Sequence, residues 1–158
     1  GGSPAAARAL SVRSVFVPRE QDPRGAGVIL VIETAGVRIV HCGVLRQAAI
    51  GDLQCLKLGR VDVLMLPADG VDHILSQEAT AAILDALDPR FVIPMHYRLP
   101  DLEPGDGPSD LGDIEPWLEG RAPIRRVGGH VLRISPEDLP DERTYLVFEH
   151  APYVVPPQ

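Results

Sequence analysis

Four side chains in this sequence could together hold a metal ion: Asp69, Asp72, His73 and His96. The first three lie in one short polar segment after an apolar run, and His96 follows a second apolar run. Carboxylates and imidazoles are ligands that zinc and manganese take, and a bound ion lets water ionise near neutral pH. One interpretation is therefore a mononuclear metal site. The other, which we favour, is a solvated loop at the start of the next helix, because short polar residues commonly cap helices.

The remaining histidines and the cysteines indicate no second cluster. His130 and His150 have no partners at the spacing of metal ligands, and Cys42 and Cys55 do not form a CxxC pair. Neither a disulfide framework nor a cysteine zinc site is indicated. We expect both thiols to be reduced and packed in the core.

The order of apolar runs and turn residues predicts an α/β fold. Strands are predicted at residues 10–17, 28–33, 37–41, 61–66, 91–93, 130–134 and 144–149. Helices are predicted at residues 50–58, 76–87 and 113–119. Strands and helices in this order predict a mixed β-sheet with helices on one face. We expect one domain over residues 10–150, preceded by a flexible N-terminus at 1–9 and followed by a proline-rich tail at 151–158.

Composition limits the classes of partner. The chain has 158 residues, 45% of them hydrophobic, which is enough to bury the core of one domain. Its 22 acidic and 15 basic residues give a formal net charge of -7, and the basic residues are scattered. No basic stripe could follow a phosphate backbone, so we expect no nucleic acid partner. The apolar runs are too short to cross a bilayer and no signal segment opens the sequence, so we expect a cytoplasmic protein without a membrane partner.

Three segments, in a consistent order and spacing, resemble the motifs of one family: Ile39-Val40-His41-Cys42-Gly43-Val44, Val61-Asp62-Val63-Leu64-Met65-Leu66-Pro67 and Val92-Ile93-Pro94-Met95-His96-Tyr97. They are similar to a strand-end motif of the form His-x-Gly-Asp, a buried VDVLLIP strand and a VIPMHY segment. On these motifs the chain resembles the C-terminal half of the metallo-β-lactamase-fold metal-dependent hydrolases, the group that includes the ascorbate-phosphate lactonases.

The resemblance implies a four-layer αββα sandwich, of which this chain forms one half. In the family, two metal ions lie in a cleft between the two sheets, and a metal-activated water attacks a lactone, amide or phosphoester. Zinc or manganese is the implied cofactor. His96 matches the last metal-binding histidine of the family. The positions that the resemblance assigns to the cleft are Arg24, Gly43, Val44, Gly70 and Tyr97.

The sequence also departs from the family pattern. Val44 stands where the family has an aspartate that bridges both metals, and its isopropyl group has no lone pair to donate. The HxHxDH cluster, which supplies most of the metal ligands, belongs to the N-terminal half of the family's fold, and no histidine precedes His41 here. A complete binuclear site within this chain is excluded by the number of ligands.

Two functions are compatible with these residues. The one we favour is a degenerate, non-catalytic metallo-β-lactamase-like domain that acts in binding or assembly and is not an enzyme by itself. The alternative is a fragment of a zinc- or manganese-dependent hydrolase whose HxHxDH half is missing or supplied by another chain. Val44 favours the first, because a missing half does not explain an aspartate lost from the half that is present.

Both functions predict a partner. The inner face of a half sandwich is apolar and must pack on another sheet, either in a homodimer or against a partner half-domain. The sequence identifies neither a substrate nor a ligand.

Overall fold

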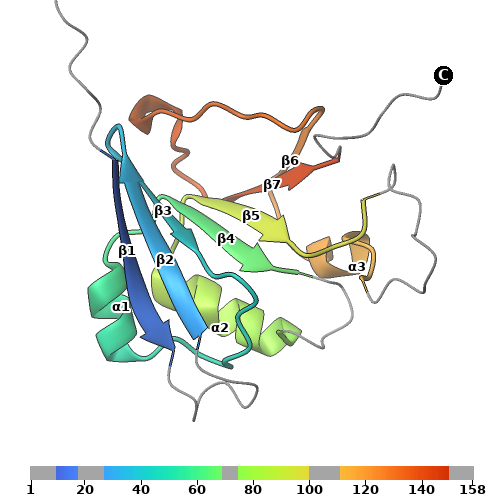
Figure 1. The fold of residues 1–158 in the computed structure, drawn as a ribbon. Coiled ribbons are helices and arrows are strands. Elements are labelled where there is room, and N and C mark those ends of the chain that lie inside the picture. Colours follow the sequence, from blue (N-terminus) through green and yellow to red (C-terminus); the bar gives the residue numbers. More distant parts are fainter. Residues whose placement is uncertain (1–9, 18–26, 69–74, 100–110, 150–158) are drawn as a thin grey trace, which may run out of the picture.

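The structure, a computed structural model, describes residues 10–17, 27–68, 75–99 and 111–149. Within them, seven strands form one sheet in the order β1-β2-β3-β4-β5-β7-β6 (Figure 1). The strands are β1 (Leu10–Val17), β2 (Gly27–Thr34), β3 (Val37–His41), β4 (Val63–Pro67), β5 (Phe91–Met95), β6 (Ile124–Val127) and β7 (Thr144–Phe148). The helices are α1 (Asp52–Leu58), α2 (Gln77–Leu87) and α3 (Glu115–Leu118), and a 3-10 turn spans Pro136–Asp138. No helix in the described part of the chain has the length and apolar character needed to cross a membrane.

The sheet is mixed, as the sequence predicts. Strands β1, β2 and β3 pair antiparallel, and the pairings β3–β4, β4–β5, β5–β7 and β7–β6 are parallel. The β2–β3 connection is a two-residue turn in which Ala35 and Gly36 have φ of 50° and 82°. A type I′ turn needs positive φ at both central residues, and its twist matches that of the flanking strands. The predicted hairpin is therefore confirmed.

The helices cover one face of this sheet. Side chains alternate between the two faces of a strand, so Ile29 and Val31 of β2 point together into the core that α1, α2 and α3 close. The start of α2 follows the sequence prediction, because the Ser76 hydroxyl accepts a hydrogen bond from the Ala79 amide at 3.1 Å. The mixed sheet with helices on one face, which the sequence predicts, is the observed fold class.

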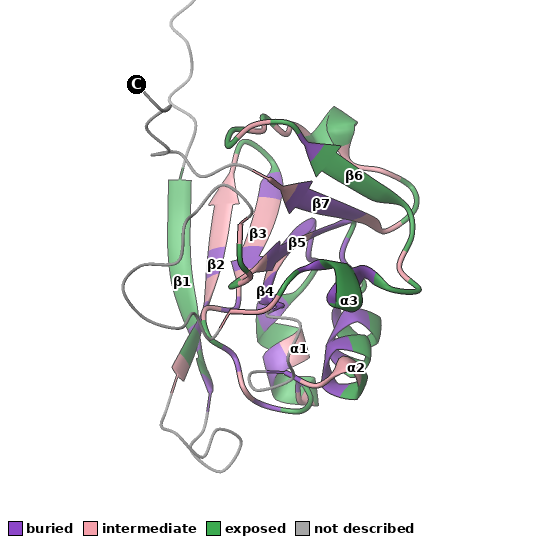
Figure 2. Cartoon of the chain, turned by 90° about the vertical axis from the view of Figure 1, so that its right-hand side faces the viewer, coloured by how far each residue is buried: buried purple, intermediate pink, exposed green. Residues whose placement is uncertain are grey.

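The opposite face of the sheet, called the inner face below, is apolar and only partly covered. Over β5 and β7 it packs against side chains from the segment that follows β6, namely Leu132, Ile134 and Leu139. In the described part of the chain this cover does not extend to β1, and Figure 2 shows β1 as an exposed strand beside a half-buried β2. The apolar inner-face side chains of this open region include Val12, Phe16, Val28, Leu30, Ile32 and Ile39.

One predicted strand is wrong. Residues 130–134 do not pair with the sheet, and the strand at this edge is β6, which begins six residues earlier in the chain, at Ile124. Arg125 and Arg126 made the true strand look like a polar loop, because β6 lies at the edge with three of its four side chains exposed. The apolar alternation of Leu132 and Ile134 is real, but these side chains pack on the inner face without forming a ladder.

Candidate functional site

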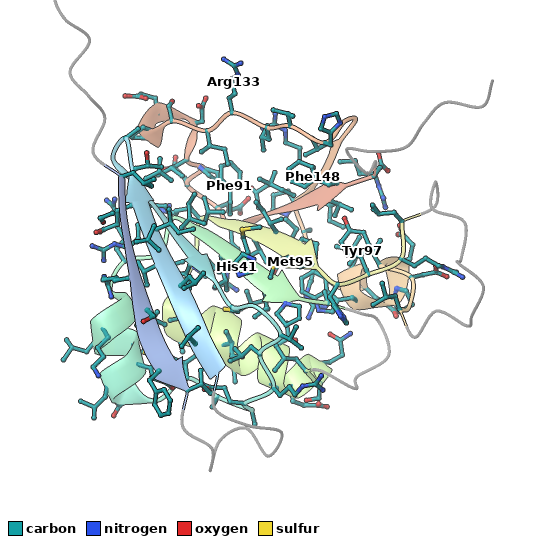
Figure 3. All side chains as sticks on the ribbon, viewed as in Figure 1. His41, Phe91, Met95, Tyr97, Arg133 and Phe148 are labelled. Carbon is teal, nitrogen blue, oxygen red and sulfur yellow. The ribbon has the colours of Figure 1, made fainter. Side chains whose placement is uncertain are left out.

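The C-terminal ends of β3, β4 and β5 meet at one edge of the sheet. These strands are parallel, with His41 opposite Met65 and Pro67 opposite Met95. The chain stays in register just past the strands, because the Cys42 amide donates to the Met65 carbonyl at 2.9 Å. Ligand sites in α/β sheets commonly lie outside the carboxyl ends of parallel strands. The side chains of His41, Met95 and Tyr97 can be followed along this edge in Figure 3.

His96 occupies this edge in an unusual conformation. It directly follows β5, its side chain is exposed and its φ is 62°, in the left-handed region. Residues other than glycine adopt this region rarely, and such residues are often found at functional sites. No hydrogen bond joins its imidazole to the rest of the described chain. The ring is therefore available to a ligand from outside these residues.

His41 is held differently. Its Nδ1 accepts a hydrogen bond from the Gly43 amide at 3.1 Å, and Gly43 has φ of 56°. A neutral imidazole that accepts at Nδ1 carries its proton on Nε2, so this ring presents a donor rather than a metal ligand. His41 thus stabilises the turn that follows β3.

The described residues do not form a metal site. Among them, no group of three or more His, Cys, Asp or Glu side chains lies close enough to hold an ion. Val44 is half-exposed after β3 and offers only methyl groups. Five of the candidate residues lie outside the described residues, so the predicted cluster stays untested: Arg24, Asp69, Gly70, Asp72 and His73. His96 is the one described member of that cluster.

A cavity lined by charged residues lies beside Tyr97, and sequence patterns did not reveal it. It has a volume of about 330 Å³, and its ion pairs join Arg98 to Asp113 at 2.6 Å and Arg126 to Glu115 at 2.7 Å. The pKa of Arg126 is raised, first by its hydrogen bond with Glu115. These partners are 15 and 11 residues apart, spacings that no local motif predicts. Because each arginine already has a carboxylate, the cavity is poorly suited to an anion.

Tyr97 is fixed in the wall of this cavity. Its hydroxyl donates to the Phe148 carbonyl at the end of β7, and burial raises the pKa of its phenol. A donor already engaged by backbone is not free to protonate a leaving group. Tyr97 therefore ties the loop after β5 to the neighbouring strand.

Comparison with known proteins agrees with this fold. The model of one protein family, the beta-lactamase superfamily domain, matches residues 5–96, which is more than half of the chain. The chain belongs to this family. Its matched region ends at His96 and includes the strand edge described above.

Individual relatives cover the chain to different extents. A UPF0173 metal-dependent hydrolase of Cupriavidus taiwanensis is 34% identical over 73 residues, which are 46% of this chain and 24% of the relative. A crystal structure from Thermotoga maritima, of a candidate Zn-dependent hydrolase of the metallo-β-lactamase superfamily, superposes with a TM-score of 0.68 and 26% identity. That match covers 88% of this chain and 64% of the other. The chain is thus a metallo-β-lactamase-fold, hydrolase-like protein that spans less than two thirds of either relative.

Proposed function

We propose that this chain is a non-catalytic metallo-β-lactamase-like domain that acts by assembly, with its inner face packed on a second sheet. The observation that carries the proposal is the open part of that face. Val12, Phe16 and Val28 are 58%, 59% and 51% exposed, whereas the apolar side chains on the helix side of the same strands, Val15, Val17, Ile29 and Val31, are buried. Contiguous exposed apolar surface on a soluble domain commonly marks an interaction site.

The second sheet could belong to a second copy of the chain or to a partner half-domain. In both cases the contact is sheet on sheet, the packing that buries two apolar faces about 10 Å apart. The segment 131–139 already covers the β5 and β7 side of the inner face, so a partner is needed chiefly over β1, β2 and β3. A partner sheet seated there would also lie next to the strand edge that carries His96.

The non-catalytic part of the proposal is supported by the donor groups. A hydrolytic metal centre needs about three protein ligands with an open position for water. The described residues supply His96 alone at the strand edge, and Val44 has no donor atom where the resemblance places a bridging aspartate. No catalytic step can be derived through a metal ion from these residues.

The second candidate function is a portion of a zinc- or manganese-dependent hydrolase of lactones, amides or phosphoesters. It is favoured by His96, an exposed imidazole in a left-handed conformation at the end of a parallel strand. It is also favoured by the hydrolase names of both relatives. In this case another polypeptide segment would carry the remaining ligands.

The deciding experiment measures hydrolysis and metal content of the purified chain. Lactone, β-lactam and phosphodiester substrates are tested with zinc or manganese added, and bound metal is counted by elemental analysis after dialysis. We expect rates equal to those of metal in buffer and well below one ion per chain, because incomplete ligand sets lose their ion. His96→Ala is compared with His130→Ala, since His130 is also exposed but follows β6, which is two strands away from β5 in the sheet. A saturable, chelator-sensitive rate that only His96→Ala abolishes would establish the second candidate.

The assembly part is tested separately by light scattering and binding of a hydrophobic dye. Leu30→Lys places a charge in the middle of the inner face on β2, and Val131→Lys places the same charge at an exposed valine after β6. We expect the first to weaken self-association or dye binding and the second to leave both unchanged. A wild-type chain that is a compact monomer and binds no dye would refute the proposal.

A further inference from the structure

Among the described residues, no strand pairs with the outer edge of β1. Thr34 and Val37 flank the two-residue turn, so they exchange backbone hydrogen bonds with each other. Along β2 the backbone groups of successive residues point alternately to β3 and to β1, so every second residue bonds to β1. In the β1–β2 register these are the partners of Ser11, Arg13, Val15 and Val17. The even-numbered residues of β1 must then direct their N–H and C=O groups away from the sheet. The side chain of Gln54 on α1 confirms this direction, because it donates to the Phe16 carbonyl at 3.3 Å.

This edge carries none of the usual protections against strand pairing. Natural edge strands are commonly blunted by proline, lysine, a bulge or very short length. Strand β1 has eight residues, no proline and no lysine, and its register with β2 is unbroken. Its one charged residue, Arg13, lies on the helix side of the sheet and donates to the Lys57 carbonyl at the end of α1. Among the described residues, β2 is the only strand that pairs with β1.

Apolar side chains are exposed on both layers at this same edge. On the sheet, Val12 and Phe16 are more than half exposed. On the helix layer, Leu53 and Leu56 of α1 are 74% and 79% exposed. A groove of about 380 Å³ lies between the two layers, with Phe16 on one side and Leu53 on the other. Figure 1 shows α1 beside β1 at the border of the molecule.

We propose that β1 pairs antiparallel with β1 of a second copy of the chain, so that the two sheets become one. The charge of Arg13 and the positions of the apolar side chains on β1 select the register of this pairing. A two-fold axis at Ser14 places Val12 opposite the partner's Phe16 and Arg13 opposite the partner's Val15, whereas an axis at Arg13 would bring two arginines face to face. Aliphatic–aromatic pairs stabilise adjacent strands, and like charges directly opposite destabilise them.

The same axis brings the helix layers together. Helix α1 flanks β1 from Arg13 to Phe16, through the Arg13 and Gln54 hydrogen bonds. A two-fold axis at Ser14 therefore places α1 next to its symmetry mate, on the helix side of the joined edge. Leu53 and Leu56 then gain an apolar contact, which explains their exposure on a seven-residue helix. The contact is isologous and self-complementary, as expected for a homodimer.

Ser14→Pro tests the backbone pairing directly. The Ser14 amide points outward, so proline removes no β1–β2 hydrogen bond, and edge strands tolerate proline there. We expect the dimer dissociation constant to rise roughly 10- to 100-fold, because each of the two chains loses one backbone hydrogen bond across the interface. Ser14→Ala is the matched control and should change it little. Circular dichroism and the fluorescence of Trp117 establish that each variant is folded.

Crosslinking tests the register even if the proline variant does not fold. In a Cys55→Ser background, Ser14→Cys should give dimers with a short bismaleimide, whereas Val131→Cys, at an exposed position in the segment after β6, should not. Absence of Ser14→Cys dimers at concentrations where light scattering shows association would overturn the proposal. A monomeric wild-type chain would overturn it as well. An oligomer that Leu30→Lys dissociates and Ser14→Pro leaves intact would overturn the edge pairing and support the sheet-on-sheet proposal instead.

Discussion

Replacing Asp62 with alanine should destabilise the fold substantially, although Asp62 belongs to no site. Its carboxylate is 2% exposed and accepts hydrogen bonds from the Arg38 amide at 2.7 Å and from Arg60 Nη2 at 3.0 Å. Its own amide donates to the Arg38 carbonyl, and its carbonyl accepts from the Phe91 amide. The residue therefore joins the beginnings of β3, β4 and β5. Those are the strands whose other ends carry His41 and His96.

The magnitude follows from the groups left without partners. Alanine removes the acceptor of a part-buried backbone amide, and unpaired buried donors or lost hydrogen bonds to a charged group cost about 1–3 kcal/mol each. We expect the free energy of unfolding to fall by about 2–3 kcal/mol. With an m-value of about 2 kcal/mol/M, the urea midpoint should fall by roughly 1 M or more. The single tryptophan, Trp117, is 2% exposed and reports unfolding by fluorescence.

Two further variants test whether the lost stability comes from the buried hydrogen bonds of Asp62. Asp62→Asn keeps an oxygen that can accept from the Arg38 amide, so it should recover much of the loss. Asp113→Ala removes an exposed carboxylate paired with Arg98, and exposed pairs contribute at most about 1 kcal/mol. If Asp62→Ala and Asp113→Ala shift the urea midpoint equally, the reasoning about buried hydrogen bonds at the strand starts is wrong.

Two other predictions concern the helix side of the sheet. Ser76→Ala should lower the free energy of unfolding by about 1 kcal/mol, because it removes the cap of α2. If Ser76→Asp, measured by urea unfolding, is no more stable than Ser76→Ala, capping is not the cause. Burial raises the pKa of Cys42 from 9.0 to about 12, so below pH 9 its thiolate is about 10³-fold scarcer than that of an ordinary thiol. Iodoacetamide should therefore label Cys55 and spare Cys42 in the native protein, as mass spectrometry of the alkylated peptides would reveal. The raised pKa of Cys42 also favours the folded state at low pH. This contribution to the free energy of unfolding is lost as the pH rises from 9 through 12.

Much of the fold could be predicted because its signals are local. The β2–β3 hairpin has an Ala-Gly turn between two alternating strands, and the start of α2 has a serine cap before an amphipathic stretch. Strand β6 could not be predicted in this way. Its Arg126 forms ion pairs with Glu115 of α3 and with Glu149 just after β7, and these pairs stabilise a charged side chain on an edge strand.

The candidate site could be predicted only in part. The motif around His96 located the strand edge, because a strand followed by a short polar segment is visible in the sequence. The tautomer of His41 depends on its hydrogen bond with the Gly43 amide, and the position of Tyr97 depends on its hydrogen bond to the Phe148 carbonyl. Neither contact is visible in the sequence. The cavity beside Tyr97 depends in the same way on ion pairs between distant segments.

Assembly and chemistry are linked in this molecule by the position of His96. Its imidazole stands at the end of β5, and the inner-face side chains of the same strand, Ile93 and Met95, are half-buried. A second sheet that packed on the inner face would end beside this ring, so that sheet, or a segment that it positions, is one source of donors that could complete a metal site with the described residues. Metal binding without assembly would then be weak, since one imidazole cannot retain an ion against water. It follows that metal content should be measured both on the isolated chain and on whatever complex the inner face forms. A metal site that appears only in the complex would be explained by the half-sandwich architecture, whereas a stoichiometric site in a monomer that both His73→Ala and His96→Ala reduce would show that the polar cluster is a genuine site.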